Sequence, residues 1–303
     1  MRRLARLALL FALVIADPVV AADTARSVRD DKGALVAVPA APCRIVSLAP
    51  GTTAMLYAAG AGHCLVGTIA HSDEPAEAAS VPIVGDAETL DFEQLLGLRP
   101  TVVVVAVDVV QRVRIDRIRA LRIPVYQVHV RRLAEMPESL QRLGALAGSE
   151  SIAQSKAAEL RSELHDIGER YRTRAPLRVL YQIWDRPIYT IGGRHVISDA
   201  LRLCGATNIF ADLETAAPAV TREATVLRDP QLILASAPPA TAAEWLAEWR
   251  KFPAMSAVRN AQLVSYSDER IDRMGPSVIE ATANLCAVID HARAAPVAAG
   301  VLN

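Results

Sequence analysis

The sequence has little that would mark a nucleic-acid-binding, disordered or fibrous protein. Lys plus Arg equals Asp plus Glu at 33 each, so no overall charge is available to attract nucleic acid or an anionic membrane. The hydrophobic content of 52% excludes intrinsic disorder, and only 15 Gly and 18 Pro exclude collagen and low-complexity sequence. Beyond the first twenty residues no run is apolar enough to cross a bilayer, which excludes a polytopic membrane protein.

The N-terminus has the features of a secretory signal peptide. Three arginines stand within the first six residues, residues 7–16 are apolar, and small residues at 19–22 offer a cleavage site after Ala22. The alternative is a membrane anchor, but the apolar run is short for that role, and Asp17 and Pro18 interrupt it. We therefore expect residues 1–22 to be removed on export.

Export makes the four cysteines candidates for disulfides, with three possible pairings. Cys43 and Cys64 each directly precede a strand-like run, with a helix-length segment between them. If the two runs are neighbouring parallel strands, both sulfurs lie at one edge of the sheet within bridging distance, which leaves Cys204 to pair with Cys286. Four buried free thiols are the alternative. A zinc site is disfavoured, and no metal site is expected, because no Cys-x-x-Cys occurs and the six His are scattered.

Strand and helix patterns alternate along the chain. Continuous apolar runs recur at residues 44–48, 65–69, 102–107, 125–128, 179–183, 232–235 and 263–266. Strands that are apolar on both faces are typical of parallel sheets covered by helices. Helical runs lie between them at 52–60, 92–98, 110–121, 137–148 and 196–204, and several end in Gly. The sequence therefore predicts an α/β fold with Rossmann-like, central parallel sheets.

One segment interrupts this alternation. Residues 149–171 carry no strand signal and no Pro, and they are rich in Ala, Glu, Leu and Arg. As a helix they would extend about 35 Å. A sparse apolar stripe runs along this helix at Ile152, Leu160, Leu164 and Ile167. We interpret residues 149–172 as a rigid backbone helix between two α/β lobes, at 39–148 and 173–295. A crossover helix within one continuous sheet is the alternative.

Two segments that lie 130 residues apart share one pattern. Glu93 is followed seven residues later by Pro100 and a strand-like run, and Glu223 is followed at the same spacing by Pro230. Each unit has the pattern of an N-cap residue, a short helix with Glu in its first turn, and a Pro-led strand. A favourable interaction with the helix dipole explains a single Glu. A matched pair, one on each lobe, suggests two docking points for a symmetric basic partner.

Catalytic signature motifs are missing. The chain holds no Gly-x-Ser-x-Gly, no Gly-x-x-x-x-Gly-Lys-[Ser/Thr], no His-Glu-x-x-His and no Gly-x-Gly-x-x-Gly. Residues of the types found in catalytic triads are present, but their spacing does not predict that they come together in the fold: Asp185, His195, Asp199 and Asp212. Residues 49–53 (APGTT) follow a strand and begin a helix, so their N–H groups could hold an anion, but they equally fit a plain turn. We expect a protein that is not an enzyme, with an exported α/β enzyme as the alternative.

The assembled features resemble the substrate-binding proteins of ABC importers that carry cobalamin, haem and siderophores. The resemblance extends over about residues 42–292 and includes the export signal, the two lobes, the backbone helix and the paired glutamates. It rests on RIVSLAP at 44–50, AAG at 58–60, VG at 66–67, SDEP at 72–75, LRP at 98–100, residues 197–210 and NLC at 284–286, with LCGATNIF at 203–210 the most specific. Within the family the likeness is greatest to members that bind cobalamin.

The resemblance implies roles for four of these residues. It implies that Glu93 and Glu223 dock onto arginines of two permease subunits, and that Cys204 and Cys286 form a disulfide, whereas a Cys43–Cys64 bridge is no part of the family pattern. It also implies a periplasmic monomer that delivers a small-molecule chelate to a permease dimer with its ATPase. Such a protein has no cofactor of its own and no nucleic-acid partner.

The ligand is expected between the lobes, beyond the carboxyl ends of the strands. The predicted ligand-binding residues are Pro50, Gly51, Thr52, His71, Trp184, Tyr189, Arg270 and Arg273. By resemblance, Trp184 and Tyr189 match aromatic positions of cobalamin binders. Tryptophans expected near Ala87, Ala106 and Ala217 are absent, and His71 stands in place of a Tyr.

A corrinoid is the expected ligand, and haem or a ferric siderophore is the alternative. Each Ala in place of a Trp gives up much of the ~150–250 Å² that an aromatic side chain can bury, so either the cleft is wider or the ligand differs. His71 could coordinate the metal of such a ligand, or it could be an ordinary loop histidine. Arg270 and Arg273 could pair with carboxylates of the ligand, or they could be plain surface arginines.

Overall fold

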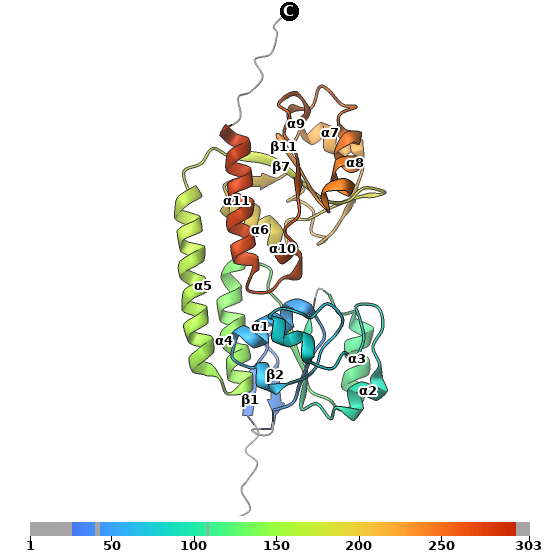
Figure 1. The fold of residues 1–303 in the computed structure, drawn as a ribbon, viewed down its shortest axis with the longest axis vertical. Coiled ribbons are helices and arrows are strands. Elements are labelled where there is room, and N and C mark those ends of the chain that lie inside the picture. Colours follow the sequence, from blue (N-terminus) through green and yellow to red (C-terminus); the bar gives the residue numbers. More distant parts are fainter. Residues whose placement is uncertain (1–25, 40–42, 108, 295–303) are drawn as a thin grey trace, which may run out of the picture.

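The computed structural model describes residues 26–39, 43–107 and 109–294, which form two α/β lobes arranged one above the other along the long axis of the molecule (Figure 1). The signal peptide predicted at 1–22 lies outside the described residues. Within the described part of the chain, no helix combines the length and the apolar character needed to cross a membrane.

The first lobe is built on a four-stranded parallel sheet in the order β4-β3-β5-β6. Its strands are β3 (Ile45–Ser47), β4 (Leu65–Gly67), β5 (Val102–Ala106) and β6 (Val125–Val128). Val102 and Val104 of β5 share a core with α1 (Pro50–Ala58) and α4 (Met136–Ala147). Val103 and Val105 share a second core with α2 (Phe92–Gly97) and α3 (Arg112–Ala120). The continuous valine run is therefore buried on both faces, as expected for a central parallel strand.

Short elements complete this lobe. β1 (Arg26–Arg29) and β2 (Leu35–Val38) form an antiparallel hairpin, and Arg26 donates a hydrogen bond to the carbonyl of Ala145 in α4. Three 3₁₀ turns follow at η1 (Gly62–Cys64), η2 (Ala76–Ser80) and η3 (Leu133–Glu135). The sequence analysis missed the hairpin, because four-residue strands with alternating exposure give a weak strand signal.

The second lobe has a six-stranded sheet in the order β10-β8-β7-β11-β12, with β9 also paired to β7. β7 (Leu177–Trp184), β9 (Ala206–Asn208), β11 (Leu232–Ser236) and β12 (Leu263–Tyr266) run parallel. β8 (Ile188–Thr190) runs antiparallel to β7, because the chain turns back directly after β7, and β10 (Ala219–Val220) pairs antiparallel with β8. The α/β class is confirmed, but this sheet is mixed rather than wholly parallel.

Helices cover both faces of the second sheet. α6 (Val196–Leu203) and α11 (Val278–Ala294) pack on one face, and α8 (Pro239–Trp249) packs on the other. Of the short helices, α7 (Arg222–Arg228) leads into β11, α9 (Ser256–Arg259) leads into β12, and α10 (Glu269–Arg273) follows β12. Trp245 and Trp249 of α8 are buried in the core of this lobe, as helix-packing residues.

The chain passes from the first sheet to the second through α5 (Glu150–Tyr171), which runs alongside both lobes (Figure 1). Its 22 residues span about 33 Å. Ala153 packs so closely on α4 that a Cβ added at Gly144 would lie 2.3 Å from the Ala153 Cβ. Ile152, expected in the buried stripe, is exposed, because the smaller Ala153 and Ala157 take the buried positions.

One of the hydrophobic cores contains residues of both lobes. It includes Ile45 and Leu140 of the first lobe, Leu160 of α5, and Tyr181 and Leu285 of the second lobe. The two lobes therefore share buried apolar surface in addition to one covalent connection.

Two disulfides are present, Cys43–Cys64 and Cys204–Cys286, with Cα atoms 5.2 and 4.8 Å apart. Both predicted pairings are confirmed. Each bridge stays within one lobe: the first joins the starts of β3 and β4, and the second joins the end of α6 to α11.

Candidate functional site

A cleft opens where the carboxyl ends of the strands of the two lobes face each other. Its first half has a volume of about 360 Å³ and is lined by residues that follow β5 and β6, including Val107 and Val130. Its second half, of about 530 Å³, is lined by Ile183 of β7, Ser236 of β11 and the start of α6. Volumes of this size suit small-molecule ligands.

The two halves form one continuous cleft, because they share Val109, Val130, Asp272 and Met274. Most lining residues of the first half are Ala, Val, Met and Pro. Ala106 lines the first half and Ala217 the second, so at two positions where tryptophans were expected the cleft is bordered by methyl groups.

Five of the predicted ligand-binding residues line the first half of the cleft: Pro50, Gly51, Thr52, His71 and Arg273. The first three form the opening turn of α1. The Thr52 hydroxyl is already engaged with Ser47 Oγ at 2.7 Å and with the carbonyl of Ala49 at 2.8 Å. This side chain stabilises the strand-to-helix turn, which agrees with the plain-turn interpretation of residues 49–53.

His71 is an exposed residue of the loop after β4, and its φ of 64° places its backbone in the left-handed region. It borders the same half of the cleft as Met274, which comes from the other lobe. The structure therefore brings an imidazole and a thioether to one apolar cavity.

Arg273 connects the two lobes at the rim of the cleft. Its guanidinium pairs with Asp73 of the first lobe at 2.5 Å and with Glu269 of its own helix at 3.3 Å. The hydrogen bond from Arg273, together with its positive charge, lowers the pKa of Asp73. Arg273 is thus oriented by two carboxylates and is not a free surface arginine.

Asp272 borders both halves of the cleft. Desolvation raises its pKa to about 6, and the negative charges of Asp268 and Glu269 act in the same direction. A carboxyl group with this pKa is partly protonated in mildly acidic surroundings, where it can donate a hydrogen bond as well as accept one.

The other three predicted residues, Trp184, Tyr189 and Arg270, are not among the described residues that line the cleft. The Trp184 ring lies 6.1 Å from the Trp245 ring in an edge-on contact, and Tyr189 lies on β8. Arg270 is held by Asp268 at 2.7 Å and by Glu280 at 2.6 Å. Ligand contact by these three residues stays a prediction.

Sequence analysis missed the contribution of the segment after β6 and of the start of α6. Val128 and Val130 line the first half of the cleft, and His195, Val196 and Ile197 line the second. The run at 125–128 was recognised as a strand, so the residues that follow it could have been added by the strand-end rule alone.

The paired glutamates lie where the repeat places them. Asp91 caps α2 by accepting from the N–H groups of Glu93 and Gln94, and Thr221 caps α7 by accepting from the N–H of Ala224. α2 and α7 lie one on each lobe, on the side away from α5 (Figure 1).

Both glutamates are exposed. The N–H of Glu223 and the Thr221 hydroxyl lower the pKa of the Glu223 carboxyl. An exposed leucine accompanies each acid, Leu96 on α2 and Leu227 on α7, the latter 86% exposed. Each lobe thus presents a carboxylate with an adjacent apolar side chain.

The four residues considered for a catalytic triad are not assembled into one. Each of the three carboxylates pairs with a different arginine: Asp185 with Arg186, Asp199 with Arg202 and Asp212 with Arg228. His195 instead caps α6 by accepting from the N–H of Ile197.

Two α/β lobes, a cleft between their strand ends and one connecting helix have the architecture of a solute-binding protein. The chain belongs to the periplasmic binding protein family, which it matches over residues 45–269. It is 30% identical over 260 residues to a vitamin B12-binding protein of Vibrio cholerae serotype O1, covering 86% of this chain and 93% of that protein. The resemblance inferred from sequence motifs is therefore confirmed.

Solved structures agree. The periplasmic vitamin B12 binding protein of Vibrio cholerae superposes with a TM-score of 0.76 at 30% identity, covering 83% of this chain and 98% of that one. A periplasmic heme-binding protein from Roseiflexus sp. RS-1 has a TM-score of 0.70 at 20% identity, covering 82% and 98%, and shares the fold. These matches are to binding proteins, in agreement with the expectation that the chain is not an enzyme.

Proposed function

We propose that this chain is the substrate-binding component of an ABC importer and that it binds a corrinoid in the cleft between its lobes. The observation that carries the proposal is the continuous cleft at the strand ends, with its apolar first half, in a chain whose relative of 30% identity is a vitamin B12-binding protein. Its valine, alanine and methionine lining suits the apolar face of a macrocycle, and Asp272 and Arg273 can bind polar substituents at the rim.

Calorimetric titration of the purified mature protein with cyanocobalamin tests this proposal. We expect saturation at one ligand per chain with a Kd of about 1 μM or below. The variant Ala106→Arg, which places a charge in the apolar half of the cleft, should weaken binding at least about tenfold. The matched control Ala158→Arg, at an exposed position of α5, should leave the Kd unchanged. Absence of saturable heat with any corrinoid contradicts the proposal.

Haem is the second candidate, and the joint presence of His71 and Met274 in one half of the cleft favours it. His and Met are axial ligands that proteins use for haem iron, and Arg273 can pair with a propionate. In this case haem binds tightly with a shifted Soret band, and His71→Ala removes the shift. Corrinoid binding without a haem-induced shift excludes this alternative.

The transport partner follows from the paired glutamates. In this proposal Glu93 and Glu223 contact basic residues on the two halves of a permease dimer that is driven by an ATPase. The protein acts as a monomer in the periplasm after removal of residues 1–22, and the chelate is its cargo, so that it needs no cofactor of its own.

A further inference from the structure

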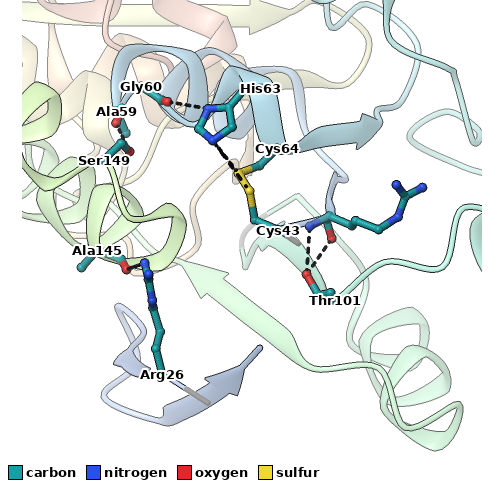
Figure 2. Close-up of a disulfide and its surroundings, with 10 residues drawn as sticks. Arg26, Cys43, Ala59, Gly60, His63, Cys64, Thr101, Ala145 and Ser149 are labelled. Carbon is teal, nitrogen blue, oxygen red and sulfur yellow. Dashed lines mark hydrogen bonds between the residues drawn. A yellow bond between two sulfur atoms is a disulfide. The ribbon is translucent and has the colours of Figure 1, made fainter. Parts of the chain in front are cut away.

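The Cys43–Cys64 disulfide lies at the amino ends of β3 and β4, whereas the cleft lies at the carboxyl ends of the sheet. Figure 2 shows the imidazole of His63 directed at this bridge. His63 Nε2 lies 3.4 Å from Cys64 Sγ and 3.8 Å from Cys43 Sγ. Two sulfurs and one nitrogen thus converge at a place that the proposed transport function does not use.

A hydrogen bond determines which ring nitrogen of His63 is available. Nδ1 lies 3.2 Å from the carbonyl oxygen of Gly60. A carbonyl oxygen only accepts, so Nδ1 carries the proton of this bond, and in the neutral ring Nε2 presents its lone pair to the sulfurs. Histidines that bind metals in proteins are commonly oriented in this way, with the second nitrogen donating to a backbone carbonyl.

The two nitrogen–sulfur spacings also match a metal site, and reduction would free the sulfurs to separate around an ion. In tetrahedral zinc coordination, Zn–S bonds of about 2.3 Å and a Zn–N bond of about 2.0 Å separate a nitrogen from a sulfur by about 3.6 Å. The two nitrogen–sulfur distances observed here lie on either side of this value. The ligand atoms of Cys43, His63 and Cys64 all lie within 4.8 Å of one another, and no other such group of three is found in the part of the chain that the structure describes.

We propose that reduction of the Cys43–Cys64 disulfide converts this place into a binding site for Zn²⁺ or a similar thiophilic ion, with Cys43 Sγ, Cys64 Sγ and His63 Nε2 as ligands. A dithiol reductant supplies two electrons and two protons, breaks the S–S bond and is itself oxidised to a disulfide. Zn²⁺ then replaces the two thiol protons, which pass to solvent, and water completes the tetrahedron.

Accessibility distinguishes this bridge from the second one. Cys64 is fully buried, but Cys43 is half-buried and His63 is exposed, so a reductant and a metal ion can approach this bridge from the Cys43 side. Cys204 and Cys286 are fully buried, and Cys204 Sγ faces the carbonyl oxygen of Thr282. The sequence expectation against a metal site relied on the missing Cys-x-x-Cys motif; the fold instead supplies one cysteine from another strand.

The test uses the mature protein, reduced without denaturant, freed of reductant and titrated with Co²⁺. We expect one Co²⁺ per chain, an intense sulfur-to-cobalt charge-transfer band, and displacement of Co²⁺ by Zn²⁺. Zn²⁺ affinity should be at least about 100-fold higher for the reduced than for the oxidised protein. His63→Ala should lower the affinity of the reduced protein at least about tenfold. The control His165→Ala, an exposed histidine of α5, should leave it unchanged.

Two results would overturn the proposal: no charge-transfer band in reduced protein that has two titratable thiols, or equal Zn²⁺ affinity with and without the His63 ring. Cys43→Ser leaves one thiolate beside His63, so the variant should show a charge-transfer band of lower intensity and bind Co²⁺ more weakly than the reduced protein. Cyanocobalamin affinity is expected to be the same with and without Zn²⁺, since the two sites lie at opposite ends of the sheet.

Discussion

The α-carbon of Gly51, at the start of α1 in the first lobe, faces the main-chain carbonyl of Arg273 in the second. A Cβ at this position would come to 2.1 Å from the Arg273 oxygen and 2.8 Å from the Met274 carbonyl carbon. Glycine at this position therefore lets the backbones of the two lobes touch at the edge of the cleft.

Gly51→Ala is expected to push the lobes apart at this contact, because the backbone oxygen cannot rotate away as a side chain would. Overpacking of this kind costs about 1–3 kcal/mol, which corresponds to a Tm lower by roughly 2–10 °C. Calorimetry measures this loss, and small-angle scattering should detect a larger radius. Gly97→Ala is the control, because its added Cβ meets nothing within 4 Å. If Gly51→Ala and Gly97→Ala have the same Tm and the same radius, the close contact between Gly51 and Arg273 is contradicted.

The paired variant Glu93→Ala with Glu223→Ala is expected to abolish stimulation of the transporter ATPase while leaving the Kd for cyanocobalamin within about twofold, because both acids are exposed and neither lines the cleft. Reconstituted transporter in vesicles provides the measurement. Glu244→Ala, an exposed acid on α8, serves as the control. Normal stimulation by the paired variant would refute the docking role.

Asp272→Asn is expected to stabilise the folded protein at neutral pH. The carboxyl pKa is about 6 in the folded state and about 3.9 in an unfolded chain. Folding therefore retains a proton in this window, and the stability contributed by Asp272 falls as pH rises from about 4 to about 6. Because the carboxylate faces an open cleft, solvent screening limits the effect to about 1 kcal/mol. Urea unfolding at several pH values should show that the free energy of unfolding falls less steeply with rising pH in the variant than in the wild type. Parallel curves of unfolding free energy against pH would contradict this prediction.

Removal of either disulfide is expected to cost about 2–5 kcal/mol, with the larger loss for Cys204→Ala plus Cys286→Ala. This bridge spans 82 residues, against 21 for Cys43–Cys64. Loop-closure entropy then differs by about 1 kcal/mol, and the buried position adds packing losses. Urea denaturation of the two double variants measures which one loses more stability. A larger loss for the Cys43 and Cys64 variant would disprove the argument.

Much of the fold could be predicted from the sequence because burial on two faces leaves a strong local signal. The run at 102–107 predicted β5, and the uninterrupted segment at 149–171 predicted α5. The hairpin of β1 and β2 and the chain reversal at β8 were missed, because strands of three or four residues are too short to show a recognisable hydrophobic periodicity.

The candidate site was harder to predict, since it depends on partners distant in the chain. Trp184 matched an aromatic position of cobalamin binders, but in the structure its ring contacts Trp245 of α8. The sequence pattern gave no sign of this contact, because the two residues lie 61 positions apart. Arg270 had the right charge, yet Asp268 and Glu280 hold it. Met274 enters the cleft because α10 ends beside Gly51, a contact between lobes that no local pattern contains.

The single passage of the chain through α5 has a consequence for how the molecule is assembled. A cut in the connection at residues 172–176 would divide it into two polypeptides, each with its own sheet and its own internal crosslink. Nothing covalent would then join them, but the apolar core that both pieces share would remain. The nicked protein should therefore behave as a tight heterodimer, and the dissociation of its fragments would measure the attraction between the lobes directly.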